Sequence, residues 1–202
     1  MSASELTWID RPGRALLKLA WPITVSMLSF STMTLASTAF VAQIGSDELA
    51  GVGLAGVVGF AYVCFGIGLL RGAKTLVSQA VGANRRDRIP ELVGAAIALA
   101  VVLGVTALVL GQLTAPLLVS LSGSPRAGAF ATDYLAIRSL GAPLVLLYAA
   151  LREASYGEGN STAPMRAALA GNAVNITLDA ILILGLGWGV QGAAVEIGRA
   201  HV

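Results

Sequence analysis

The chain has 202 residues, of which 56% are hydrophobic and only 12% are charged, and its mean hydropathy is +0.79. Soluble domains carry about 25% charged residues, so this composition excludes a fold whose whole surface faces water. The net charge of +2 and the isoelectric point near 9.0 are compatible with a nucleic-acid partner. We expect none, because the position of the basic residues along the chain has a better explanation, given below.

Long uncharged runs predict helices that cross a membrane. Runs of 28, 22 and 34 residues separate Lys18 from Asp47, Glu48 from Arg71, and Glu91 from Arg126. A helix needs about 20 apolar residues to cross a bilayer, whereas barrel strands are alternating segments of about 10. We predict an all-α integral membrane protein with five complete helices and a truncated sixth: 14–44, 49–82, 90–118, 127–152, 163–186 and 190 onward.

The first two expected helices carry polar residues whose roles remain open. Pro22 either kinks the first helix or occupies its first turn. The hydroxyl residues of that helix either bond back to their own helix or line a cavity; they are Ser26, Ser29, Thr34, Ser37 and Thr38. In the second helix, Arg71 and Lys74 either reach the headgroups with their long side chains or line a water-filled cleft.

A single carboxylate, Asp179, stands in the fifth expected helix, within the uncharged run between Arg166 and Glu196. Asn175 lies one helical turn before it and Asn172 two turns before, so the three residues share one face. A medium of low dielectric constant disfavours a lone charged carboxylate, and amides can help it hold a small cation. We predict a proton or sodium site here; the alternative is a structural Asp that joins two helices by hydrogen bonds.

Both ends of the chain differ from the expected helices. Residues 1–13 form a polar segment without the features of a signal peptide. The last letters, "EIGRAHV" (196–202), break the apolar pattern and resemble an adaptor-derived translation fused to an incomplete reading frame. We therefore expect a truncated chain with a non-native tail, and we give Glu196 and His201 no functional role.

The basic residues near the expected helix ends lie mostly on one side of the membrane. The side of the N-terminus has eight: Arg11, Arg14, Lys18, Arg85, Arg86, Arg88, Arg152 and Arg166. The opposite side has only Arg126. Lys and Arg are enriched in cytoplasmic loops, so we predict a multi-pass protein of the cell's inner (plasma) membrane with a cytoplasmic N-terminus.

Catalytic patterns are missing from the sequence. Cys64 is the one cysteine and His201 the one histidine, which excludes an intrachain disulfide, a Cys-based zinc site and a histidine pair. The glycines of "GVGLAG" (51–56) follow no strand and lie in an expected membrane helix, so they do not indicate a nucleotide site. We expect no enzyme, no metal site and no cofactor, with H⁺ or Na⁺ as the coupling ion.

Several stretches together resemble the multidrug and toxic compound extrusion (MATE) family. "LAWPITVSML" is similar to the family's first-helix entry, and "STAFVAQIGSDELAGVGLA" to the passage from helix 1 to helix 2. "LVSQAVGANRRDR" resembles the helix 2 exit, "LREASYGEGNSTAPM" the loop between helices 4 and 5, and "NAVNITLDAILILGLGWGVQGAA" helix 5 with its turn into helix 6. The resemblance covers residues 12 to 195, and the order and spacing of the stretches carry it.

The resemblance implies a two-lobed, twelve-helix antiporter that exports cationic or amphipathic small molecules against a proton or sodium gradient. This chain would supply the N-terminal lobe (14–195), and a missing C-terminal lobe would complete it. The family's coupling-cation site would then comprise Asp179, Asn175 and Tyr134, the last also placed to pair with Arg138 four residues later. Pro22 and Ser37 would belong to a conformational switch in helix 1, with Asn172, Thr34, Arg71 and Lys74 as further cavity-lining candidates.

One departure from the family pattern concerns Ser37, which stands where many members carry a helix 1 aspartate. Only Asp179 remains of that carboxylate pair, so the ion and the coupling strength stay open. Two alternatives also remain: a flippase of the same fold for lipid-linked or peptide-like compounds, and a non-transporting membrane subunit. The flippase requires Arg71 and Lys74 to face a basic cavity.

Overall fold

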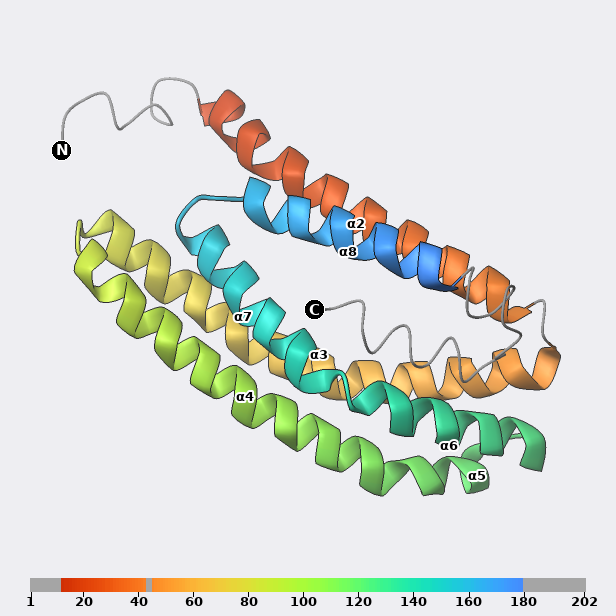
Figure 1. The fold of residues 1–202 in the computed structure, drawn as a ribbon. Helices are drawn as coiled ribbons and strands as arrows, with labels where there is room; N and C mark the ends of the chain where they lie inside the picture. The colour runs from red at the N-terminus through yellow and green to blue at the C-terminus, as the bar shows by residue number, and fades with distance from the viewer. Residues whose placement is uncertain (1–11, 43–44, 180–202) are drawn as a thin grey trace.

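A computed structural model describes residues 12–42 and 45–179, which form helices joined by short turns (Figure 1). The elements are α2 (Pro12–Ala42), α3 (Ser46–Gly82), η2 (Arg86–Arg88), α4 (Ile89–Thr114), η3 (Ala115–Leu117), α5 (Leu118–Leu121), α6 (Pro125–Ser139), α7 (Ala142–Gly157) and α8 (Thr162–Asp179). The prediction of an all-helical chain is confirmed for this part. The expected sixth helix and the tail 196–202 lie outside the described residues.

Three helical stretches of the described residues are long and apolar enough to cross a membrane: Pro12–Ala42, Ser46–Gly82 and Arg86–Leu121. They agree with the first three predicted spans. The bent pair of α6 and α7 becomes a fourth if it is counted as one span. The fifth predicted span, 163–186, begins with α8 and continues beyond the described residues.

The fourth predicted span was wrong in one respect, because it is broken. The sequence indicated one helix over 127–152, but α6 and α7 meet at Leu140–Gly141 with a bend of 50°. Pro143 lies in the first turn of α7, where its missing N–H is tolerated and its ring excludes an uninterrupted helix. Gly104 of α4 lies directly against the backbone of Pro143, so the bend is packed against a neighbouring helix.

The helices α3, α4, α6 and α7 form one packed body. One cluster near the start of α3 joins it to α6 and the end of the α4 stretch; its buried members include Ala55, Leu118 and Leu135. A second joins α3, α4 and α7 around Leu70 and Leu146. Many of the buried positions are Ala or Gly, which let helix backbones approach closely where lipid provides no hydrophobic driving force.

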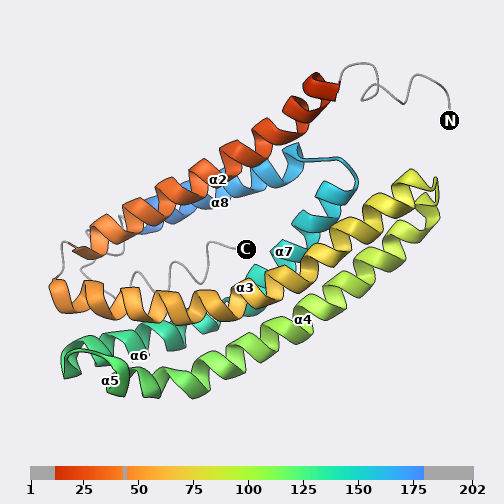
Figure 2. The same cartoon turned by 180° about the vertical axis from the view of Figure 1, so that it is seen from behind.

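The helices α2 and α8 form a separate pair. They lie side by side in both views, and both run in the same direction along the chain (Figures 1 and 2). α2 packs mainly against α8 and contacts α3 much less. The first and last helices of the described chain are therefore joined to each other more extensively than to the body.

Polar contacts tie the start of α3 to the start of α6. The Ser124 hydroxyl donates to an Asp47 carboxylate oxygen at 3.0 Å and also accepts the backbone N–H of Ala127. Arg126 forms an ion pair with the buried Glu48, Nη2 to Oε1 at 3.0 Å. These residues lie between the first and second predicted spans and between the third and fourth. Alternating crossings put both connections on the same side of the membrane, so their contact agrees with the predicted order of crossings.

Candidate functional site

The interface between α2 and α8 contains a partly buried polar contact. The side-chain amide of Asn172, on α8, donates to the hydroxyl of Ser29, on α2, with Nδ2 and Oγ 2.9 Å apart. Asn172 is 7% exposed. This hydrogen bond joins the first and fifth predicted membrane helices at a fixed register.

Asn175, one turn further along α8, is completely buried. On α2, Ser37 is also buried, at 7% exposed, and each of the two residues has an interaction partner. Burial of an amide and a hydroxyl on two neighbouring helices adds further polar oxygens to the α2–α8 pair. Such oxygens suit a proton or a hard cation better than an apolar ligand.

Asp179 is the last described residue of α8, and its side chain lies outside the described residues. The backbone nevertheless fixes its level. It follows Asn172 by seven residues, and Ser37 follows Ser29 by eight. Because α2 and α8 run in the same direction and each residue advances a helix by about 1.5 Å, positions 179 and 37 come to nearly the same height.

Pro22 lies inside α2, the eleventh residue of a helix that begins at Pro12. The alternative that placed it in the first turn is therefore wrong, and the interior position expected for a kink is correct. Its ring is buried, and its carbonyl accepts the Ser26 hydroxyl at 2.8 Å. Proline removes one backbone hydrogen bond, and a back-bonded serine in the next turn adds to the tendency of a helix to bend.

Most hydroxyls of α2 bond to their own helix, as one of the two sequence interpretations stated. Thr34 donates to the Phe30 carbonyl at 3.0 Å, and Thr38 to that of Thr34 at 2.8 Å. Thr34 is exposed, and its role as a cavity-lining residue stays a prediction. Ser29 differs, because it accepts a hydrogen bond from another helix.

Tyr134, the third predicted cation ligand, lies on α6 in the buried cluster around Ala55 and Leu135. The predicted pairing with Arg138 is confirmed: Nη1 donates to the tyrosine Oη at 3.4 Å, and the guanidinium carbon is 5.9 Å from the ring centroid. In Figures 1 and 2, α6 lies beside α3 and α5, whereas α8 lies beside α2. The part of Tyr134 in a cation site stays a prediction.

Arg71 and Lys74 are both exposed on α3. α3 has 37 residues, which at 1.5 Å each makes it about 55 Å long, compared with a hydrocarbon core of about 30 Å. The helix is therefore longer than an upright crossing of the hydrocarbon core requires. Since Arg71 and Lys74 lie 11 and 8 positions before its end at Gly82, their long side chains are able to reach the headgroups, as one of the two sequence interpretations requires.

The sequence did not indicate that Ser29 would be the partner of Asn172, 143 positions away. Ser29 was one of several similar hydroxyls, and nothing in a single sequence pairs it with one particular amide. In the ranges 12–42 and 45–179, no group of three or more His, Cys, Asp or Glu residues is arranged to hold a metal ion. The oxygens available to a cation are thus those of single carboxylate, amide and hydroxyl groups.

The Asn172–Ser29 hydrogen bond predicts a coupling that can be measured. Asn172→Ala and Ser29→Ala should each destabilise the folded protein, and the double variant should be less destabilised than their sum. Inter-helix hydrogen bonds in membranes contribute roughly 0.5–1.7 kcal/mol, so we expect a coupling energy in that range from denaturant unfolding in detergent. Thr24→Ala combined with Asn172→Ala is the control, because the Thr24 hydroxyl bonds within α2; strict additivity for Ser29 and Asn172 would contradict the contact.

Comparisons with known proteins give one consistent result. The family model MatE matches residues 22–181. The chain is 33% identical over 198 residues to a probable multidrug resistance protein NorM of Pseudomonas putida, covering 93% of this chain and 42% of that protein. It is 29% identical over 199 residues to the chloroplastic Protein DETOXIFICATION 44 of Arabidopsis thaliana, covering 92% of this chain and 38% of that protein.

A solved structure of an outward-facing multidrug resistance MATE family transporter of the MOP superfamily is similar in fold. The TM-score is 0.86 and the sequences are 26% identical, over 94% of this chain and 42% of that one. The chain therefore spans about two fifths of the length of the proteins to which it is similar. The expected likeness to one lobe of a two-lobed protein agrees with this fraction.

Proposed function

The chain belongs to the MatE family, and we propose from this premise that it is the N-terminal lobe of a secondary transporter that exports cationic or amphipathic small molecules in exchange for H⁺ or Na⁺. A second lobe, encoded by the intact gene, completes the protein in this proposal. The chain's coverage of about two fifths of its relatives supports it. We call the chain together with that second lobe the full-length protein.

The coupling ion binds at Asp179 in this account. The observation that supports it best is the register of the α2–α8 pair, in which the Asn172–Ser29 contact brings positions 179 and 37 to nearly equal height. Ser37 stands where the resemblance expects a second carboxylate, so a hydroxyl and the amide of Asn175 accompany one carboxylate. A site with a single ionisable group exchanges one unit of positive charge at that group.

Coupling to transport would proceed through α2. Binding of a cation at Asp179 changes the charge beside α2, the helix that α8 contacts most extensively and that contains the buried Pro22. A cation that binds one conformation of α2 more tightly shifts the population toward that conformation. In the proposal this shift selects between the outward-facing and inward-facing states. Members of this family are transporters and not enzymes, so we propose no catalytic activity for the chain.

Two observations test the proposal. The intact gene should encode the rest of the sixth helix after about residue 195 and then a second pattern of six membrane helices. The full-length protein, reconstituted in vesicles, should then export a cationic dye when a proton or sodium gradient is imposed, and should not do so when both gradients are collapsed. Dye export without dependence on either gradient would contradict coupled antiport.

The exposed cations of α3 make one alternative testable, a flippase of the same fold whose lipid-linked substrate is anionic. If Arg71 and Lys74 contact such a substrate, the double variant Arg71→Gln/Lys74→Gln should lose export of anionic compounds by about tenfold or more, the equivalent of about 1.4 kcal/mol. If they reach the headgroups, export of any substrate should change by less than about twofold. We expect the change of less than about twofold, because α3 is long enough for both side chains to reach the headgroups. Export of a cationic and of an anionic substrate, measured side by side, distinguishes the two results.

A further inference from the structure

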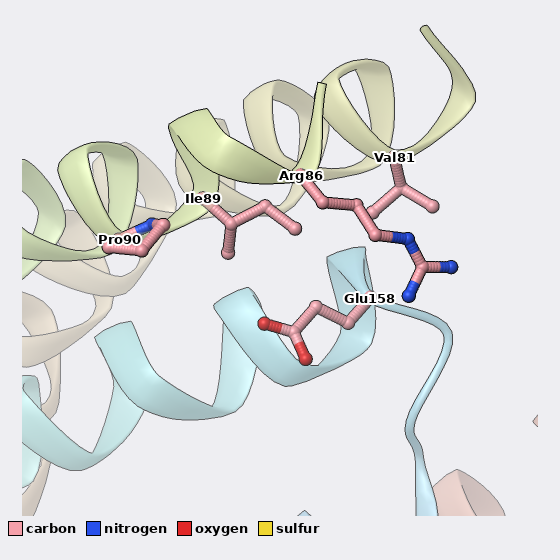
Figure 3. Close-up of a pocket in the computed structure, with 5 residues that line it drawn as sticks. All are labelled: Val81, Arg86, Ile89, Pro90 and Glu158. Carbon is pink, nitrogen blue, oxygen red and sulfur yellow. The ribbon is translucent and has the colours of Figure 1, made fainter. Parts of the chain in front are cut away.

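A small pocket lies at the end of the body opposite the Glu48–Arg126 ion pair. It has a volume of about 280 Å³ and is lined by Val81, Arg86, Ile89, Pro90 and Glu158. These residues come from the end of α3, the turn into α4 and the end of α7 (Figure 3). Pockets for drug-sized ligands have volumes of about 300–1,000 Å³, so this one suits a smaller group.

The pocket has one charge of each sign, and the two do not pair with each other. The ion pairs among the described residues are Arg88–Glu91, Arg126–Glu48 and Arg152–Glu153, so Arg86 and Glu158 are not engaged in any of them. In Figure 3 the guanidinium lies on the Val81 side of the pocket and the carboxylate on the Ile89 side. The pocket therefore presents a cation and an anion at two separate positions.

The nearby ion pairs leave Arg86 and Glu158 available to a ligand. Arg88 and Glu91 occupy each other at 3.5 Å, and the carboxylate of Glu153 is buried beside Arg152 at 3.1 Å. Arg86 and Glu158 are both exposed, so a ligand outside the protein is able to reach them. A ligand that satisfies both needs an anionic and a cationic group on one small framework.

The pocket lies at the ends of two apolar spans, where the lipid headgroups are expected. It is built at the C-terminal end of the span Ser46–Gly82 and at the start of the span Arg86–Leu121. Val81, Ile89 and Pro90 supply an apolar side next to the two charges. A ligand with a charged head and an apolar continuation toward the bilayer matches this combination.

We propose that the pocket binds the headgroup of a membrane phospholipid with a primary amine, in which a phosphate and an ammonium group are joined by a short linker. Arg86 donates N–H groups to the phosphate, because a guanidinium is suited to contact two phosphate oxygens. Glu158 accepts N–H groups from the ammonium. A trimethylammonium headgroup has no N–H to donate, and a purely anionic headgroup leaves Glu158 repelled, so Glu158 sets the selectivity.

The proposal rests on the position of the pocket at the end of two membrane spans and does not require that the protein transports. The test uses the full-length protein, purified in detergent and incubated with an equal mixture of phosphatidylethanolamine, phosphatidylcholine and phosphatidylglycerol. Native mass spectrometry then measures how much of each lipid stays bound. We expect phosphatidylethanolamine to be retained about three- to fivefold over phosphatidylcholine, the ratio typical of one charge pair at an exposed site.

Two variants separate the two contacts. Glu158→Gln should reduce the retention of phosphatidylethanolamine to that of phosphatidylcholine, because only the ammonium contact is lost. Arg86→Gln should reduce the retention of both lipids, because both have a phosphate. Glu91→Gln and Arg14→Gln are matched controls, since Glu91 already faces Arg88 and Arg14 is an exposed cation of α2; neither should alter the preference.

Other outcomes overturn the proposal. Equal retention of the three lipids by the unmodified protein shows that the pocket does not select a headgroup. Stronger retention of phosphatidylglycerol than of phosphatidylethanolamine shows that the arginines between α3 and α4 form a surface for anionic lipids. Binding of soluble phosphoethanolamine without any preference among the lipids shows that the membrane is the wrong source. A phosphatidylethanolamine preference that survives both variants shows that the lipid binds elsewhere.

Discussion

Asp179→Asn is expected to reduce gradient-driven efflux by the full-length protein to the level of empty vesicles. Asparagine has nearly the same shape and retains hydrogen-bonding atoms, but it has no charge to exchange with a proton or a sodium ion. Insertion of the helix should not suffer, because a charge at the bilayer centre costs on the order of 3 kcal/mol that an amide does not. The measurement is export of a cationic dye under an imposed proton or sodium gradient.

Asp133→Asn is the matched control for this experiment. Asp133 is an exposed carboxylate on α6, so its loss should leave efflux unchanged. Comparable amounts of folded protein, measured by size-exclusion chromatography, are required for both variants. If Asp179→Asn exports the dye as fast as the unmodified protein under the same gradient, the coupling ion is bound elsewhere, and the structural role of Asp179 becomes the correct one.

Gly104→Ala is expected to destabilise the body of the protein by roughly 1–3 kcal/mol, the usual cost of adding a methyl group where no space exists. A Cβ atom on Gly104 would meet the backbone of Pro143 at the start of α7. Backbone atoms cannot turn aside as a flexible side chain does, so α4 and α7 must separate. The measurement is the midpoint of thermal or denaturant unfolding in detergent.

Gly94→Ala supplies the matched control on the same helix. Nothing lies within 4 Å of a Cβ added there, and alanine is favoured over glycine in a helix by about 1 kcal/mol. This variant should be as stable as the unmodified protein or slightly more stable. Equal behaviour of the two variants would show that α4 and α7 do not pack as described.

The sequence predicted the order of the helices well because the signal is chemical and local. Uncharged runs longer than a bilayer crossing mark α2, α3 and α4 without reference to any contact. The prediction that successive connections lie at alternate ends of the helices was also correct. The Ser124–Asp47 contact joins two connections at one end. The pocket lined by Arg86 and Glu158 joins two connections at the other end. The break between α6 and α7 was missed because Gly141 and Pro143 are both tolerated within a membrane helix.

The candidate site was only partly accessible to sequence reasoning. The spacing of Asn172, Asn175 and Asp179 follows from helical periodicity alone, and α8 has that periodicity. Which helix they face does not follow from the spacing, because it depends on the packing of segments more than 140 residues apart. The Ser29 contact supplies that information and orients α8 toward α2. For Tyr134, the pairing with Arg138 within α6 was predictable from the sequence. The position of Tyr134 relative to α8 was not, because it depends on how the helices pack.

The central claim, that Asp179 binds the coupling ion, is tested most directly by the release of that ion when substrate binds. Substrate is added to the purified full-length protein in weak buffer, with a pH indicator to count protons and radioactive sodium to count sodium ions. The account predicts that the unmodified protein releases one of the two ions and that Asp179→Asn releases neither. Equal release from both proteins would contradict it.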